Sequence, residues 1–275
     1  MKTQKGLREL KDLNLLDRFL FAEVIEDREI MELILEIILE KEVKLKQIPQ
    51  AEREQRGFFL SKQAKLDVLS VSEADELFNT EVQKQKTNNL PKRTRFYHSI
   101  ITSRLLPAGT VDYNKLNDVY VIMIMPFDLF GEGKYKYCFS MMCKGSPGKE
   151  LGDGVNTIFL NTRGTDPDGV SDELIALLKY FEHSTKRNAE KHESDRIKRL
   201  HKKVESIKSN DEIGVKLMNA WEEKLMFKEE GREEGRKEGE SNATLKIARN
   251  LKSDGLPVDI IAKNTGLTKE EVEKL

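Results

Sequence analysis

Two neighbouring apolar stretches each carry a carboxylate where a buried strand normally has an apolar side chain. Asp67 interrupts AKLDVLSV, and Glu81 lies within LFNTEVQKQ. The polar sequence SEADE between them is typical of a turn, so the segment predicts a β-hairpin with strands at Leu66–Val71 and Leu77–Gln85. Folding the chain at that turn would bring Asp67 opposite residues 81–83, so that two carboxylates meet at the edge of a sheet.

The polar residues of the second strand suggest a metal site. Glu81, Gln83 and Gln85 point to one face because side chains alternate along a strand. Two like charges at close range repel, and a hard divalent cation such as Mg²⁺ relieves that repulsion. Mg²⁺ can also lower the pKa of a bound water and supply a nucleophile near neutral pH, and Gln83 would orient that water or a phosphate oxygen. The alternative is that acids paired across a hairpin simply form a solvated face.

A basic helix follows the hairpin directly. The sequence LPKRTRFYHS lies in a helix predicted over Asn89–Leu106 and started by Pro91. Its first turns carry cations and an aromatic ring that could hold a phosphodiester backbone: Lys92, Arg93, Arg95 and Tyr97. Basic helix starts near turns are also common without any such function. His98 could approach phosphate from the same helix, whereas solvated positions are expected for His183, His192 and His201.

The elements that must position these residues alternate between helix and strand. IMELILEIILE at Ile30–Glu40 predicts a largely buried helix with one solvated stripe formed by Glu32, Glu36 and Glu40. VYVIMIMPFDLF and KYKYCFSMMC predict two strands paired as a hairpin, and NTIFLNTRG predicts a further short strand. This mixture predicts an α/β or α+β domain with a central mixed sheet.

The composition changes after about Lys186, where strand patterns stop and long charged helical sequence begins. We therefore expect three regions. They are a domain at 1–185, a charged helical region or linker at 186–240, and a helical pair at 241–275.

Three evenly spaced glycines interrupt the charged region. GREEGRKEGE places Gly231, Gly235 and Gly239 four residues apart, and each glycine in a helix interior costs about 1 kcal/mol relative to alanine. The spacing indicates either the close approach of another helix or a flexible joint.

The last stretch, LPVDIIAKNTGLTKEEVEKL, predicts helix, turn and helix. Gly266 would end the first helix, and Thr268 with Glu271 would form a capping box for the second. A shared apolar contact is predicted for Ile260, Ile261, Leu267, Val272 and Leu275. The pattern resembles a DNA-reading helix-turn-helix, but the second helix is net acidic, which favours a pairing module. We expect a homodimer through these C-terminal helices.

Charge and composition exclude some classes of protein. The net charge is −1, so binding to nucleic acid would require a local basic patch. Cys138 and Cys143 match no metal-binding or disulfide pattern. The N-terminus has no apolar signal core, and no stretch approaches the roughly 20 apolar residues of a membrane span. These features predict a cytoplasmic protein without membrane contact.

Several segments together resemble a known family. KLDVL followed by TEVQKQKTNNLPKRTRFYHSIITSRLL resembles the Rpn family of recombination-promoting nucleases and transposases, within the PD-(D/E)XK nuclease superfamily. VIMIMPFDLFGEGKYKYCFSMMC, IFLNTRGT, GREEGRKEGE and IAKNTGLTKEEVEKL also look like that family. The resemblance covers nearly the whole chain. It implies a restriction-endonuclease-like α/β core, with a central mixed sheet flanked by helices and a C-terminal helical extension.

The resemblance also implies roles for individual residues. Asp67 and Glu81 would be metal ligands, and Gln83 would stand where the wider superfamily carries a lysine. Asp17, in LLDRFLF, would be a third ligand, although a helix N-cap is an equally good interpretation. Two residues match the basic and aromatic positions of the helix after the hairpin: Arg93 and Tyr97.

The implied activity is Mg²⁺-dependent endonucleolytic cleavage of DNA with little sequence preference, linked to recombination or to defence against mobile DNA. Two other interpretations stay open. The protein could be a catalytically weak DNA-binding or oligomerising component, or a nuclease held inactive by its C-terminal helices. Both acids and the glutamine are present, so the site is not visibly degraded.

Overall fold

The computed structural model describes residues 8–46, 50–55, 64–103, 105–106 and 109–275, with only the backbone described for 50–55 and 64–68. The chain divides into two compact units, Met1–Gly214 and Val215–Leu275.

The first unit is built on a mixed sheet that has six strands in the described residues, in the order β1-β2-β3-β4-β6-β5. The strands are β1 (Gln50–Gln55), β2 (Ala64–Val71), β3 (Leu77–Val82), β4 (Val119–Met125), β5 (Lys136–Phe139) and β6 (Val155–Asn161). β1, β2 and β3 are antiparallel neighbours, whereas β3, β4 and β6 run parallel. The predicted hairpin is therefore confirmed as β2 and β3, although β3 ends at Val82 and not at Gln85.

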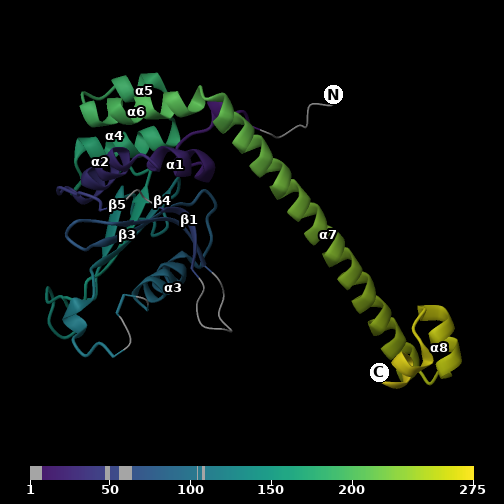
Figure 1. Ribbon diagram of the computed structural model, residues 1–275. Helices are drawn as coiled ribbons and strands as arrows, with labels where there is room; N and C mark the ends of the chain where they lie inside the picture. Colours follow the sequence, from purple (N-terminus) through teal and green to yellow (C-terminus); the bar gives the residue numbers. More distant parts are fainter. Residues whose placement is uncertain (1–7, 47–49, 56–63, 104, 107–108) are drawn as a thin grey trace. The chain divides into compact units, whose positions relative to one another are not determined.

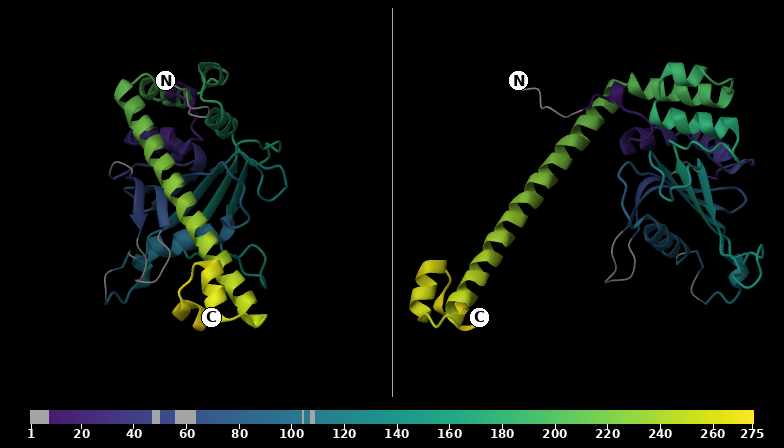
Figure 2. Two further views of the ribbon diagram at one scale, coloured as in Figure 1. Left: turned by 90° about the vertical axis from the view of Figure 1, so that its right-hand side faces the viewer. Right: turned by 180° about the vertical axis from the view of Figure 1, so that it is seen from behind.

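Helices cover both faces of this sheet (Figure 1, Figure 2). One face carries α3 (Leu90–Thr102), and the other carries α1 (Arg18–Ile25), α2 (Arg28–Leu39) and α4 (Asp172–Glu182). Two further helices, α5 (Lys186–Glu190) and α6 (Asp195–Lys208), pack on the outside of these three. The inner side of α3 joins an apolar cluster with β3 and β4 that includes Leu77, Tyr97, Ile100, Val119 and Val121. This layered α/β arrangement confirms the expected fold class and is consistent with a restriction-endonuclease-like core.

The compact unit continues beyond residue 185 because α6 packs against α1 and α2. One side of α6 is fully enclosed, through Ile197, Leu200 and Val204. The charged character of this segment is therefore confined to the outer side of an amphipathic helix. The division of the chain into three functional regions stays a prediction.

The predicted pairing of KYKYCFSMMC with the preceding strand is wrong. β5 pairs with β6, and β4 instead lies between β3 and β6 with parallel neighbours on both sides. The physical reason is burial: six of the seven residues of β4 are buried, as expected for a central parallel strand covered on both faces. β5 is shorter and takes the edge of the sheet.

The solvated glutamate stripe predicted on α2 is also wrong at one end. Glu32 is buried, and its Oε1 accepts a hydrogen bond from the backbone N–H of Leu45 at 2.8 Å. Glu36 is half-buried, and its Oε1 accepts one from the N–H of Val43 at 3.3 Å. These carboxylates satisfy backbone donors of the segment that follows the helix, and only Glu40 is exposed.

The second unit contains a long helix, α7 (Asp211–Ser253), which begins just before the boundary, and two short ones, α8 (Val258–Thr265) and α9 (Lys269–Glu273). Ala248, Ile261 and Val272 form its buried cluster. The predicted capping box of Thr268 and Glu271 is confirmed. Ile260 does not belong to the cluster, since it is 45% exposed.

The three glycines lie inside the continuous helix α7. A Cβ built at Gly231, Gly235 or Gly239 would meet no atom within 4 Å in the described chain, so neither a break nor a closely packed neighbour is present there. Pairing of two copies through the C-terminal helices stays a prediction. Among the described residues, no helix combines the length and the apolar composition needed to cross a membrane.

Candidate active site

Glu81 lies near the carboxyl end of β3, in a strand whose six residues are all buried. It is paired with Met123 of the parallel strand β4. The backbone N–H of Gln83 donates to Ile124 O at 2.8 Å, so pairing with β4 continues past the last residue of β3. Ligands in α/β proteins commonly bind beyond the carboxyl ends of parallel strands. This end of β3 is therefore a suitable place for a site.

The carboxylate of Glu81 is enclosed by protein. Its side chain is only 3% exposed. Arg93 Nη2 donates to Glu81 Oε2 at 3.1 Å, and Asn79 Nδ2 donates to Glu81 Oε1 at 3.4 Å. A buried charge is tolerated when it is paired and hydrogen-bonded, and both conditions are met here.

Arg93 ties Glu81 to Gln83. The same nitrogen, Arg93 Nη2, also donates to Gln83 Oε1 at 3.0 Å. The guanidinium lies over the ring of Tyr97, 5.6 Å from its centroid, because residues four apart are neighbours on a helix surface. Gln83 Nε2 in turn donates to Gln85 O at 2.6 Å. Both ends of the Gln83 amide are thus engaged within the chain, whereas we predicted that they would orient water or phosphate.

Two buried polar atoms beside Glu81 have no hydrogen-bond partner among the described residues: Arg93 Nε and Asn79 Oδ1. The amide of Asn79 is oriented by Glu81, since a flipped amide would set its oxygen against a carboxylate oxygen. Such orphaned groups are uncommon in native proteins and often mark functional positions or bound water and ions.

Asp17 is the N-cap of α1, with Oδ1 accepting from the N–H of Phe19 at 3.2 Å. This confirms the N-cap interpretation. Its other oxygen, Oδ2, pairs with Lys84 Nζ at 3.1 Å. Lys84 follows Glu81 by three residues, so the ion pair ties the start of α1 to the chain that leaves β3. Ligation of a metal by Asp17 stays a prediction.

Asp67 belongs to β2, but its side chain lies outside the described part of the structure. The backbone register pairs Val68 with Thr80 and Leu69 with Asn79. Continuing this antiparallel register by one residue sets position 67 opposite Glu81, as the sequence predicts. Among the side chains that are described, no group of three His, Cys, Asp or Glu residues is arranged to hold a metal.

The four predicted DNA-binding residues of α3 fall into two pairs. Lys92 and Arg95 are exposed. Tyr97 is only 7% exposed and packs in the apolar cluster under α3, so its ring does not present a surface for bases. Arg93 faces Glu81. Sequence reasoning treated the four residues as one surface and missed Asn79, although its spacing of two from Glu81 already indicates a shared face.

The histidines lie apart from these contacts. His98 is buried, with Nε2 2.9 Å from Thr157 Oγ1. Burial lowers the pKa of His98 to about 4, although the charge of Asp153 acts in the opposite direction. The prediction of a solvated His201 is wrong, because its Nδ1 is hydrogen-bonded to the hydroxyl of Tyr180 at 2.8 Å.

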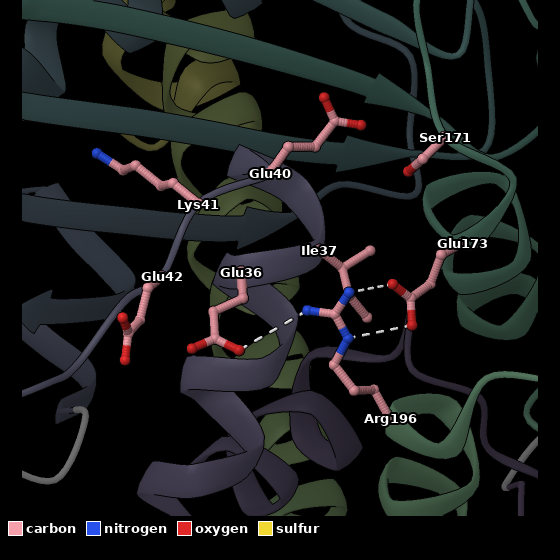
Figure 3. Close-up of a pocket in the computed structure, with 8 residues that line it drawn as sticks. All are labelled: Glu36, Ile37, Glu40, Lys41, Glu42, Ser171, Glu173 and Arg196. Atoms are coloured by element: carbon pink, nitrogen blue, oxygen red, sulfur yellow. Dashed lines mark hydrogen bonds and ion pairs between the residues drawn. The ribbon is translucent and has the colours of Figure 1, made fainter.

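A hollow of about 670 Å³ lies elsewhere on the first unit, and no predicted site residue lines it. Figure 3 shows Arg196 reaching across it to Glu173 by two hydrogen bonds and to Glu36 by an ion pair of 3.7 Å. Burial acts to raise the pKa of Glu173, but hydrogen bonds from Arg196 and Ser194 outweigh it and the pKa is lowered. Arg196 thus pairs with two of the four carboxylates that line the hollow.

A family model described as "PD-(D/E)XK nuclease family transposase" matches residues 17–229. The matched stretch begins at Asp17 and contains the hairpin, α3 and all six strands. Comparison with curated proteins and with solved structures gave no match.

Proposed function

The chain belongs to the PD-(D/E)XK nuclease family of transposases, and on this premise we propose that it is a metal-dependent endonuclease that hydrolyses phosphodiester bonds in DNA. The observation that carries the proposal is the position of Glu81. It is a buried carboxylate at the end of a central strand, held in one orientation by Asn79 and Arg93. Charged side chains are almost never fully buried unless they are paired, and the pairing of Glu81 with Arg93 fixes its carboxylate at the end of the strand.

The polar atoms present suit a hard divalent cation. The set combines the carboxylate of Glu81 with amide oxygens, and Asn79 Oδ1 is buried without a hydrogen-bond donor in the described chain. A hydrated cation brings waters that would supply this missing donor. We propose that Glu81 and Asp67 hold Mg²⁺, with Asp17 as a further candidate. When bound, Mg²⁺ supplies a water of lowered pKa and neutralises charge on the phosphate.

The protein's own side chains prepare this site. Asn79 and Arg93 each engage a different oxygen of Glu81, which limits rotation of the carboxylate. Arg93 also holds Gln83, so the polar residues at the end of β3 form one connected unit. Before a metal binds, these contacts hold the carboxylate at the end of β3.

DNA is proposed as the substrate because the helix whose Arg93 pairs with the buried acid also carries exposed cations. Arg93, which pairs with Glu81, lies between Lys92 and Arg95 in the sequence of α3. Contacts of such side chains to phosphates position a nucleic acid without reading its sequence. Low sequence preference is the expected consequence.

A plasmid-nicking assay tests the proposal. We expect nicking with Mg²⁺, none with EDTA, and at least a 100-fold loss for Glu81→Gln, on the order of the loss when metal binding is impaired. Glu132→Gln is the matched control, because it removes a carboxylate from an exposed loop. Folded wild-type protein that does not nick any DNA with Mg²⁺ would refute the proposal, as would full activity in Glu81→Gln.

A further inference from the structure

Arg93 already occupies one side of the Glu81 carboxylate. Its Nη2 uses both hydrogens, one toward Glu81 Oε2 at 3.1 Å and one toward Gln83 Oε1 at 3.0 Å. Asn79 engages the other oxygen of Glu81. Both carboxylate oxygens thus already accept hydrogen bonds from the protein.

Glu81 and Arg93 are buried to different extents. The side chain of Glu81 is 3% exposed and that of Arg93 is 28% exposed. Glu81 is therefore shielded from water and depends on a nearby positive charge, whereas Arg93 has access to water if it leaves. Of the two partners, Arg93 is the one that can move at lower cost.

Arg93 is also incompletely satisfied where it lies. Its Nε is buried without a hydrogen-bond partner in the described residues, and an unmade hydrogen bond of a buried donor opposes that placement. The ring of Tyr97 under the guanidinium gives a weaker, less directional contact. This combination is typical of a side chain that is held chiefly by its charge partner.

We propose that Arg93 is a built-in counter-ion for Glu81, and that a divalent cation binds at Glu81 by displacing it. The idea rests on the metal site of the proposed function. A guanidinium and a metal ion on one carboxylate are like charges at short range and repel. Arg93 is thus a positioning residue: it holds the Glu81 carboxylate in place without metal, and it sets the metal concentration at which the site fills.

The test measures Mg²⁺ binding to the full-length chain without DNA, from the rise in the midpoint of thermal unfolding with Mg²⁺ concentration. Arg93→Met should bind Mg²⁺ about tenfold more tightly than wild type, equivalent to about 1.4 kcal/mol. Arg93→Lys keeps the charge and should stay within about threefold of wild type. Arg199→Met is the matched control. It breaks an exposed ion pair between Arg199 of α6 and Glu29 of α2, and the Mg²⁺ affinity of this variant should be unchanged.

A folded Arg93→Met protein that binds Mg²⁺ equally or more weakly would overturn the inference. If this variant shows no cooperative unfolding, NMR of arginine side chains in the wild type tests whether Mg²⁺ displaces Arg93. The Arg93→Lys variant then serves to assign the Arg93 signals. Saturating Mg²⁺ should shift the Arg93 guanidinium signals, and unchanged signals would overturn the proposal.

The result is separable from the nuclease proposal. A wild type that fails to nick DNA, together with tighter Mg²⁺ binding by Arg93→Met, would remove the activity but support the counter-ion. If neither protein binds Mg²⁺, the counter-ion idea fails as well.

Discussion

Replacing Arg93 should destabilise the first unit more than neutralising its partner. Arg93→Met leaves the Glu81 carboxylate 3% exposed, and breaking a buried ion pair in this way costs about 3–5 kcal/mol. Glu81→Gln leaves a guanidinium that is 28% exposed and still donates to Gln83. Its cost should be only about 1–3 kcal/mol, as for one poorly satisfied polar group. The difference follows from exposure and from the hydrogen bond to Gln83 that Arg93 keeps, because both variants remove one charge of the same pair.

Urea unfolding without Mg²⁺ measures this asymmetry. All six tyrosines lie in the first unit and the single tryptophan, Trp221, lies in the second. Near-UV circular dichroism of tyrosine therefore follows the first unit, whereas tryptophan fluorescence serves as a control for the second. The double variant Glu81→Gln with Arg93→Met should lose less free energy of unfolding than the two single variants lose in sum, and the difference should be roughly 1–3 kcal/mol. An Arg93→Met loss equal to or smaller than that of Glu81→Gln would refute the reasoning.

Two further predictions concern α3. The pKa of His98 is lowered to about 4 in the folded protein. As the pH falls below about 6.5, the unfolded chain therefore binds a proton at His98 before the folded protein does. The free energy of unfolding should decline by up to about 3 kcal/mol between pH 6.5 and 4. His98→Gln should flatten this decline in unfolding measured against pH, and an unchanged profile would contradict the assignment. Lys92→Gln and Arg95→Gln should each reduce the slope of log affinity for DNA against log salt by about 1. Titrations across salt concentrations check this, and a slope unaffected by both changes would exclude these cations from the interface.

Local patterns predicted the elements of the site well. The hairpin of β2 and β3 follows from alternation and a polar turn, and the capping box at Thr268 follows from residues three apart. The N-cap at Asp17 has the same local origin. These features depend on neighbours in sequence, so no knowledge of packing is needed to find them.

Errors arose where distant segments decide the outcome. The pairing of β5 with β6 depends on which strands flank β4 in the sheet. The apolar sequences of β4 and β5, which follow each other along the chain, do not show which strands become neighbours. Glu32 was predicted to be solvated because the spacing of the apolar residues identifies only the apolar side of a helix. The chain after α2 returns over the other side, and its backbone donates a hydrogen bond to the Glu32 carboxylate.

The sequence by itself determined which residues carry charge at the end of β3 and which family the chain resembles, and it predicted that Asp67 lies opposite residues 81–83. Only the tertiary structure decided what Arg93 does. On a helix viewed alone, Arg93 is one of three basic residues, equivalent to Lys92 and Arg95. Packing of α3 on β3 and β4 rotates Tyr97 inward and aims Arg93 at Glu81. The orientation of a helix about its own axis is fixed by the surface it covers, and that surface is assembled from strands far apart in the chain.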